Sequence, residues 1–417
     1  MEKMEKKVVI IGGGFGGLTA AKKLRSADVE ITLIDKTNHH LFQPLLYQVA
    51  SAALSPADIA APIRAILRKQ ENVRVIMGEV INIDTQRRKV FLHDDEFDYD
   101  YLIAAIGSRH SYFGKDEWEK YAPGLKTMSD ALALREKMLL SFEKAERSND
   151  PIEVQKHLTF VIVGGGPTGV ELAGAIAEIA RHTMMKDFRK INPANTKIIL
   201  VEASNKILGI YDEPLNDKGR ILIEELGVQI KLNSKVTGIN SLGVKLENEF
   251  IETQNVIWAA GNTIPPLIRT LNTELDKAGR VIVEKDCSVK EHPEIFVIGD
   301  AALCYDKNGK QLPGVCPVAI QQGNFVARII AKQIPKEERI PFKYFDKGNL
   351  ATIGRARAIM QIGKIKASGL IAWLAWVLIH ILYLIGFRNR YKVLAEWIWL
   401  YITNRNGIRL ITNKTDM

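Results

Sequence analysis

KVVIIGGGFGG, residues Lys7–Gly17, is the stretch that decides the fold of this 417-residue chain. An apolar run typical of a buried strand leads into Gly12, Gly14 and Gly17, and residues 18–24 then have helical composition. In such a strand–turn–helix unit the first glycine permits the tight turn, the second lets the backbone approach a pyrophosphate, and the third lets the helix pack on the strand. The helix N-terminus faces the phosphates. The stretch therefore predicts a Rossmann-like dinucleotide-binding unit.

A carboxylate follows at a suitable distance. The next predicted strand ends in Asp35, 18 residues after Gly17. That spacing suits an acceptor for ribose hydroxyls. Because strand, helix and acid are all present, we prefer a nucleotide site to a ligand-free glycine turn.

The same pattern returns 152 positions later as FVIVGGGPTG, residues 160–169, with Gly164, Gly166 and Gly169 in the glycine positions. The following strand closes with Glu202, 33 residues after Gly169, because a polar insertion lengthens the connection. A carboxylate there would bond an adenosine ribose and repel a 2′-phosphate, which favours NADH over NADPH. The alternative is that Glu202 only ends a surface strand. Two such units in one chain predict two dinucleotides, non-covalent FAD at the first and NADH at the second, between which a hydride can pass.

Composition excludes several classes. The three cysteines form no C-x-x-C pair, so we expect neither a disulfide framework nor a metal site. The apolar run Val8–Ile11 is too short for a secretory signal, and we expect no export. The formal net charge of +9 is compatible with a nucleic-acid partner, an anionic membrane or solubility alone, and no nucleic-acid-binding motif is present.

The C-terminal part is strongly apolar. Residues 367–387 hold no formally charged side chain over 21 positions, and four of the six tryptophans lie at Trp373, Trp376, Trp397 and Trp399. About 20 apolar residues suffice to cross a bilayer, and tryptophan is enriched at the lipid–water boundary. Basic residues flank the segment on both sides, which favours a monotopic anchor on an anionic surface over a span. We expect His380, in mid-segment, to be packed rather than to bind a ligand.

Several stretches resemble the two-dinucleotide-binding flavoprotein family, and within it the type II NADH dehydrogenases, which are single-subunit, non-proton-pumping NADH:quinone oxidoreductases. The resemblance covers roughly residues 6 to 366. Besides the glycine motifs, it rests on residues 40–50, 104–107, 165–178, 258–261, 298–300, 313–322 and 348–354. Disulfide reductases of this superfamily carry a redox cysteine in the stretch that corresponds to residues 40–50, where this chain has none. The resemblance therefore implies transfer to a quinone rather than to a thiol.

The resemblance also implies roles for single residues. Asp300 would bind the ribityl or phosphate region of FAD, and Gln321, with Gln322 beside it, would bond a quinone carbonyl. The alternative for both glutamines is a polar helix start after Pro317. Many relatives have Ala-Gln where this chain has Cys316-Pro317. Glu171 would act near the nicotinamide or supply a proton to the quinone, or it is an ordinary acid stabilising a helix N-terminus.

Further cofactor contacts are expected from residues of the same motifs. These are Phe15, Gly16, Lys36, Gln43, Gly107, Thr168, Ala260, Gly261, Gly299 and Ala319.

The sequence thus predicts an α/β protein with two Rossmann-like domains and a hydrophobic helical membrane anchor at the C-terminus. The expected domains are an FAD-binding part at 6–115, a helical connector at 116–157, an NADH-binding domain at 158–285, a second FAD-binding part at 286–335, and a β-hairpin with anchoring helices at 336–417. We expect an enzyme on the cytoplasmic face of the inner membrane. The sequence leaves open whether it is a monomer or a homodimer. The alternatives are an NADH-dependent reductase of a ferredoxin-like protein and a non-catalytic NADH-sensing flavoprotein.

Overall fold

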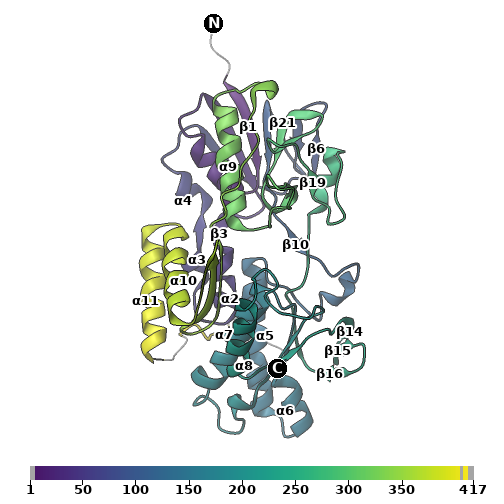
Figure 1. The fold of residues 1–417 in the computed structure, drawn as a ribbon, viewed down its shortest axis with the longest axis vertical. Helices are drawn as coiled ribbons and strands as arrows, with labels where there is room; N and C mark the ends of the chain where they lie inside the picture. Colours follow the sequence, from purple (N-terminus) through teal and green to yellow (C-terminus); the bar gives the residue numbers. More distant parts are fainter. Residues whose placement is uncertain (1–4, 404–406, 412–417) are drawn as a thin grey trace. The chain divides into compact units, whose positions relative to one another are not determined.

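The computed structural model describes residues 5–403 and 407–411, and the chain divides into two compact units. Of the described residues, 5–41, 60–109 and 262–346 form unit 1, and 42–59, 110–261, 347–403 and 407–411 form unit 2. Each unit is built around its own sheet, which is parallel in unit 2 and parallel except for one edge pair in unit 1 (Figure 1).

Unit 1 contains a six-stranded sheet with the order β20-β21-β9-β1-β2-β5. All neighbouring strands are parallel except the edge pair β20 and β21. The strands are β1 (Lys6–Ile11), β2 (Val29–Asp35), β5 (Val73–Met77), β9 (Tyr101–Ala104), β20 (Ser288–Val289) and β21 (His292–Val297). The apolar ends of β1, β9 and β21 are buried, as in a sheet that is covered on both faces, whereas the edge strand β5 is partly exposed.

Two helices of unit 1 pack closely on one another. These are α1 (Phe15–Lys23) and α9 (Cys316–Ala331). A Cβ atom on Gly323 would lie 2.4 Å from the carbonyl oxygen of Gly16, so a glycine is needed at this crossing. The close approach brings the start of α9 beside the first glycine motif.

Smaller elements complete unit 1. They are β3 (His39–Leu41) with β4 (Ala60–Pro62), α4 (Ile63–Leu67), the meander β6 (Asn82–Asp84), β7 (Lys89–Phe91) and β8 (Glu96–Asp98), the pair β19 (Val281–Ile282) and β22 (Ala302–Leu303), and the 3₁₀ turns η5 (Pro266–Leu271), η6 (Gly299–Ala301) and η7 (Lys336–Glu338). Short strands β10 (Arg109–His110) and β18 (Asn262–Thr263) lie where the chain passes between the units.

Unit 2 contains a four-stranded parallel sheet with the order β13-β12-β11-β17. The strands are β11 (Thr159–Val163), β12 (Lys197–Val201), β13 (Val228–Lys231) and β17 (Asn255–Trp258), and a separate meander is formed by β14 (Val236–Asn240), β15 (Gly243–Leu246) and β16 (Phe250–Glu252). The helices are η1 (Gln43–Leu45), α2 (Leu46–Ala50), α3 (Pro56–Ile59), η2 (Asp116–Trp118), α5 (Met128–Arg147), α6 (Pro151–His157), α7 (Pro167–Glu178), η4 (Pro193–Asn195) and α8 (Leu215–Glu225). A π-helical turn, Ile179–Thr183, continues α7.

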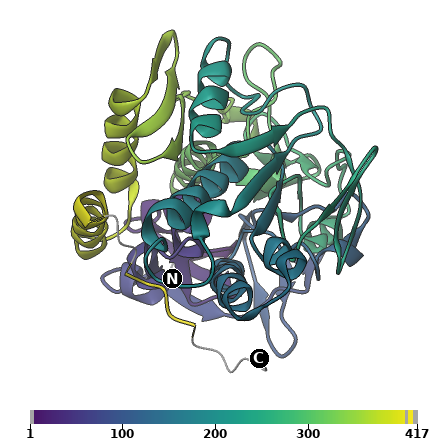
Figure 2. The same ribbon diagram turned by 90° about the horizontal axis from the view of Figure 1, so that it is seen from below.

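The C-terminal part of unit 2 begins with a small antiparallel sheet. The expected hairpin has a third strand, because β23 (Asn349–Gly354) and β24 (Arg357–Ile362) are followed by β25 (Ile365–Ser368). Helix α10 (Leu370–Tyr383) lies against this sheet, and α11 (Phe387–Thr403) follows (Figure 2). On its other side β23 packs on α7, where a Cβ atom on Gly174 would meet the carbonyl oxygen of Ile353 at 1.8 Å.

The apolar segment 367–387 does not form one continuous helix. Its first residues belong to β25, α10 has only 14 residues, and the chain turns at Gly386, where φ is +88°. Helix α10 has already ended at Tyr383, where Leu384 is extended, and the left-handed backbone at Gly386, which favours glycine, lies just before α11. Among the helices in the described part of the chain, none combines the length and apolar character required to traverse a bilayer.

The predicted α/β class with two nucleotide-binding folds is confirmed. The packing division differs from the predicted boundaries at four places. Residues 42–59 and 110–115 pack within unit 2, and residues 262–285 and 336–346 pack within unit 1. Because the predicted boundaries follow cofactors rather than packing, the assignment of domains to cofactors stays a prediction.

Candidate active site

The two glycine turns have nearly the same backbone geometry. Gly12 and Gly164 have φ of +101° and +113°, and a Cβ atom there would lie 2.3 Å from the Ala105 oxygen and 2.8 Å from the Ala259 oxygen respectively. Cβ atoms on Gly17 and Gly169 would each meet the carbonyl oxygen of the first glycine of their own motif at 1.9 Å. The spacing of both motifs is therefore imposed by backbone contacts.

Both turns are held by the predicted acids. The Gly13 N–H donates to Asp35 Oδ2 at 2.6 Å, and the Gly165 N–H donates to Glu202 Oε2, also at 2.6 Å. The second oxygen of Glu202 accepts from the Ser204 N–H at 2.8 Å. A carboxylate oxygen can accept more than one hydrogen bond, so both acids keep capacity for ribose hydroxyls.

The middle glycines leave room for a ligand. Among the described residues, no atom lies within 4 Å of a Cβ atom placed on Gly14 or Gly166. Each of these glycines is the N-cap of the following helix, α1 or α7, and its own side-chain position provides no cap for the first amides. Open backbone at a helix start, with an acid held beside the turn, fits the diphosphate and ribose of a dinucleotide.

The other predicted contacts of unit 1 gather at the carboxyl ends of the parallel strands. Gly107 and Gly299 follow β9 and β21, and both have positive φ. Asp300 accepts a hydrogen bond from the Ser108 hydroxyl at 2.6 Å. Ala319 lies in the first turn of α9, close to Gly299. Unit 1 thus brings together most residues predicted to bind FAD.

The remaining residues that were predicted to bind a cofactor differ in their surroundings. The Phe15 ring meets the His40 ring edge-on, with 5.0 Å between the centroids, whereas Lys36 and Thr168 are exposed. Gln43 belongs to unit 2, where its side chain donates to the Lys126 carbonyl at 3.0 Å. Ala260 and Gly261 follow β17 in the same way that Gly107 follows β9.

Gln322 points into the interior of unit 1. Its side chain is 1% exposed, its Oε1 accepts from the Gly299 N–H at 2.7 Å, and its Nε2 donates to Cys304 Sγ at 3.0 Å. Through these hydrogen bonds Gln322 stabilises the Gly299–Asp300 turn. Gln321 pairs with the backbone of Phe345 through two bonds of 2.9 Å. Both glutamines lie in α9, and their contact with a quinone stays a prediction.

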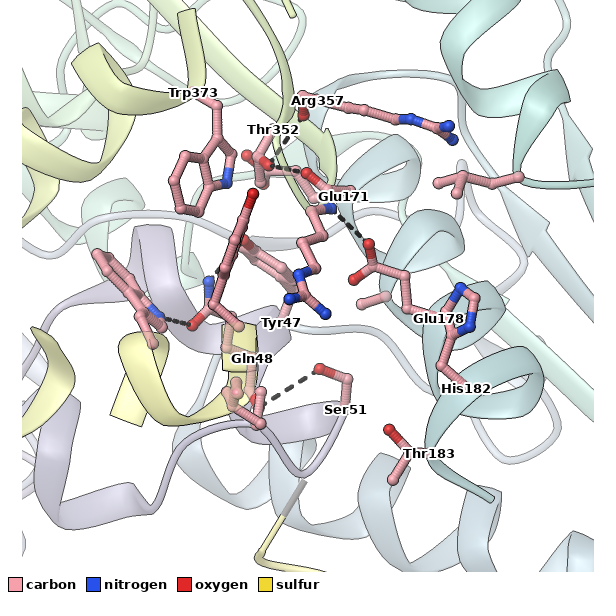
Figure 3. A pocket seen from close by; sticks show the side chains of 18 of the residues that line it. Tyr47, Gln48, Ser51, Glu171, Glu178, His182, Thr183, Thr352, Arg357 and Trp373 are labelled. Carbon is pink, nitrogen blue, oxygen red and sulfur yellow. Dashed lines mark hydrogen bonds between the residues drawn. The ribbon is translucent and has the colours of Figure 1, made fainter. Parts of the chain in front are cut away.

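A cavity of about 370 Å³ lies within unit 2 (Figure 3). One wall is aromatic, with Trp373 and Trp376 from α10 and Trp397 and Tyr401 from α11. The other walls come from α2, α7, the π-helical turn and the strands β23 and β24. They include Tyr47, Gln48, Ser51, Glu171, Glu178, His182, Thr352, Arg355 and Arg357.

A smaller hollow of about 100 Å³ lies beside it in the same unit. Its lining includes Gln43, Lys126 and Thr168, the last from the first turn of α7. Glu171 and Tyr47 line both spaces. These two side chains therefore stand between the start of the second nucleotide-binding helix and the aromatic cavity.

The surroundings of Glu171 favour its protonated, neutral form. Burial raises its pKa to about 8, although a hydrogen bond from the Thr352 N–H opposes the shift. Burial also raises the pKa of Glu178, whose carboxylate accepts from the Arg355 N–H. Below pH 8 the Glu171 carboxyl is mostly neutral and can donate a proton, which an exposed acid at a helix start would not do.

His380 is packed, as expected. Its Nδ1–H donates to the Trp376 carbonyl at 2.7 Å, and its ring stacks on the Trp376 ring with 4.1 Å between the centroids. Burial lowers its pKa to about 4, so the ring stays neutral near neutral pH.

Comparison with known proteins agrees with this architecture. Residues 6–323 match the pyridine nucleotide-disulphide oxidoreductase family model, and residues 347–406 match the NDH2 C-terminal domain. The type II NADH:quinone oxidoreductase Ndh of Mycobacterium tuberculosis is 43% identical over 98% of this chain and 90% of its own length. The chain belongs to the type II NADH:quinone oxidoreductase family. NdhA of the same organism is 44% identical over 98% of this chain and 90% of its own length.

More distant proteins share the fold. The structure of NDH2 from Plasmodium falciparum in complex with NADH has a TM-score of 0.87 at 21% identity and covers 96% of this chain and 99% of its own. The sulfide:quinone oxidoreductase of Aquifex aeolicus has a TM-score of 0.74 at 19% identity, and the alignment covers 94% of this chain and 92% of that one. At these identities the likeness concerns the fold alone.

The sequence interpretation missed part of the site of this type II oxidoreductase. Tyr47 and Gln48 lie inside the stretch 40–50 that carried the resemblance, but their places in the cavity were not predicted. Glu178 and His182 follow Glu171 by 7 and 11 positions, which places all three on one stripe of a helix. That spacing is the signal that could have identified them.

The neutral state of Glu171 can be measured. We expect an infrared band of protonated carboxyl near neutral pH, part of which disappears as the pH rises through about 8. Glu171→Gln should remove that part, because an amide of similar shape cannot titrate. Glu224→Gln is the matched control, since Glu224 lies at the surface of α8 beside Arg220. An unchanged titration in Glu171→Gln would contradict the assignment.

Proposed function

We propose that this protein oxidises NADH and reduces a membrane quinone, with FAD as the resident cofactor. The observation that carries the proposal is that Glu171 and Tyr47 line both the hollow beside the first turn of α7 and the aromatic cavity. One partly buried acid and one phenol are thus shared by a space at the NADH-binding turn and a space suited to an aromatic ring.

The residues of the chain supply binding, orientation and a proton. Bound FAD supplies two-electron chemistry by accepting hydride equivalents from NADH and passing electrons to the acceptor. The reaction NADH + H⁺ + quinone → NAD⁺ + quinol takes up one proton from water per turnover. Glu171, mostly neutral below pH 8, can hold that proton beside the cavity. In this proposal no proton moves across a membrane.

The acid at the second turn sets the choice of nucleotide. Glu202 accepts from both the Gly165 and Ser204 amides, so its carboxylate is fixed beside the turn. A 2′-phosphate at that position would face a negative charge. We infer that NADH is preferred to NADPH.

We also propose that α10 and α11 hold the enzyme at the surface of an anionic bilayer without crossing it. Leu370, Leu374, Leu378 and Leu382 recur at every fourth position of α10 and are all exposed. This spacing gives one apolar stripe on the helix. Arg390 of α11 donates to the Leu382 and Leu384 carbonyls, which ties the start of α11 to the end of α10. The cytoplasmic face of the inner membrane is the location that we propose.

Anaerobic spectroscopy tests the reaction. NADH should bleach the flavin absorbance of the purified protein, and a short-chain quinone should restore it. Gly166→Val should prevent bleaching by NADH but not by dithionite, because its side chain occupies the open space at the second turn. Reoxidation only by a ferredoxin-like protein would favour the protein-acceptor alternative. Bleaching too slow to support any turnover would favour an NADH sensor.

Vesicle flotation tests the anchor. The native protein should float with anionic vesicles, and Leu378→Glu should weaken partitioning about tenfold or more, because burying a leucine contributes about 1.5–3 kcal/mol. Leu242→Glu is the matched control, since Leu242 and Leu378 are both 59% exposed and only Leu378 lies on α10. If both variants lost vesicle binding to the same extent, the assignment of α10 as part of the anchor would be contradicted. Unchanged flotation together with a smaller oligomer in Leu378→Glu would instead assign the stripe to a homodimer.

A further inference from the structure

Three side chains of unit 2 form a directed chain of hydrogen bonds at the cavity. The Trp397 indole N–H donates to Gln48 Oε1 at 2.7 Å, and Gln48 Nε2 donates to the Tyr47 hydroxyl oxygen at 2.8 Å. The three residues are 9%, 9% and 6% exposed, and all of them line the cavity. Figure 3 shows Tyr47 and Gln48 together at this wall.

The chemistry of the chain fixes its direction. An indole nitrogen can only donate, so the amide of Gln48 must turn its oxygen toward Trp397 and its NH₂ group toward Tyr47. The Tyr47 oxygen is then an acceptor for Gln48, and the hydroxyl hydrogen points elsewhere. Within residues 5–403 and 407–411, the structure shows no hydrogen bond that uses this hydrogen.

The surroundings keep the phenol in its donor form. Burial and the neighbouring Glu171 raise the pKa of Tyr47 well above its ordinary value. A group that can donate, cannot easily ionise and lines the cavity suits an acceptor atom that gains negative charge during the reaction.

We propose that the Tyr47 hydroxyl donates a hydrogen bond to a carbonyl oxygen of the quinone, and that Trp397 and Gln48 are positioning residues that fix it as a donor. This inference rests on the proposed function. Tyr47 gives up no proton in this step, and it stabilises the carbonyl oxygen as electrons arrive. Because Trp397 lies in α11, the anchor helix itself supplies the first donor of the chain.

Stopped-flow kinetics on the flavin-loaded protein measures flavin reoxidation by quinone separately from flavin reduction by NADH. Tyr47→Phe should lower the rate of flavin reoxidation by a short-chain quinone about tenfold, the effect of losing one hydrogen bond in the transition state. Flavin reduction by NADH should keep its native rate. Gln48→Glu should slow flavin reoxidation as much as Tyr47→Phe does. A carboxylate at this position still accepts from Trp397, but it also accepts the hydrogen bond that the Tyr47 hydroxyl would otherwise donate to the quinone.

A double-mutant cycle shows whether Trp397 acts through Tyr47. Trp397→Phe should slow reoxidation several-fold in the native background and have little further effect in Tyr47→Phe. Trp376→Phe is the matched control, because Trp376 lines the same cavity and its indole N–H has no partner among the described residues. Its effect should be the same in both backgrounds.

Three results would overturn the inference. The first is that Tyr47→Phe is reoxidised at the native rate. The second is that Trp397→Phe slows reoxidation as much in the Tyr47→Phe background as in the native one, and the third is that Trp376→Phe is coupled to Tyr47→Phe as strongly as Trp397→Phe is. If the native flavin is not reoxidised by quinone at all, the proposed function fails instead. If quinone reoxidises it and Tyr47→Phe behaves as native, only this inference fails.

Discussion

The structure depends on one interaction that occurs twice, a hydrogen bond from a glycine-loop amide to the carboxylate at the end of the next strand. Gly13 bonds Asp35 in unit 1 and Gly165 bonds Glu202 in unit 2, each at 2.6 Å. Each bond joins the turn after one strand to the end of its parallel neighbour. It thereby aligns a helix start, an open glycine and an acid, which together fit a dinucleotide.

The second unit carries an addition that gives a nucleotide-binding fold a cavity, which we propose to be the quinone site. Strand β23 approaches α7 so closely that residue 174 must be glycine. The approach places the Thr352 amide on Glu171 and partly desolvates that acid, which raises its pKa. The aromatic wall from α10 and α11 closes the other side of the cavity. Packing of a C-terminal sheet on one helix thus sets both the shape of the cavity and the charge state of its acid.

Much of this could be predicted from the sequence because it follows from local patterns. The glycine turns, Asp35 and Glu202 are where the spacing predicts them. The rest depends on contacts between distant segments. Nothing local shows that Gln322 turns inward to Gly299, or that Gln48 meets Trp397 across 349 positions. The apolar run 367–387 predicts an anchor, but its composition does not show that α10 ends at Tyr383 and that α11 begins at Phe387.

The central claim is that each carboxylate serves a different dinucleotide. It is tested most directly by measuring flavin per chain and NADH affinity in Asp35→Ala and Glu202→Ala, side by side. We expect Asp35→Ala to lose flavin, and Glu202→Ala to keep its flavin while binding NADH on the order of tenfold more weakly, as loss of a charge-assisted hydrogen bond implies. Loss of flavin in both variants, or in neither, would contradict the account.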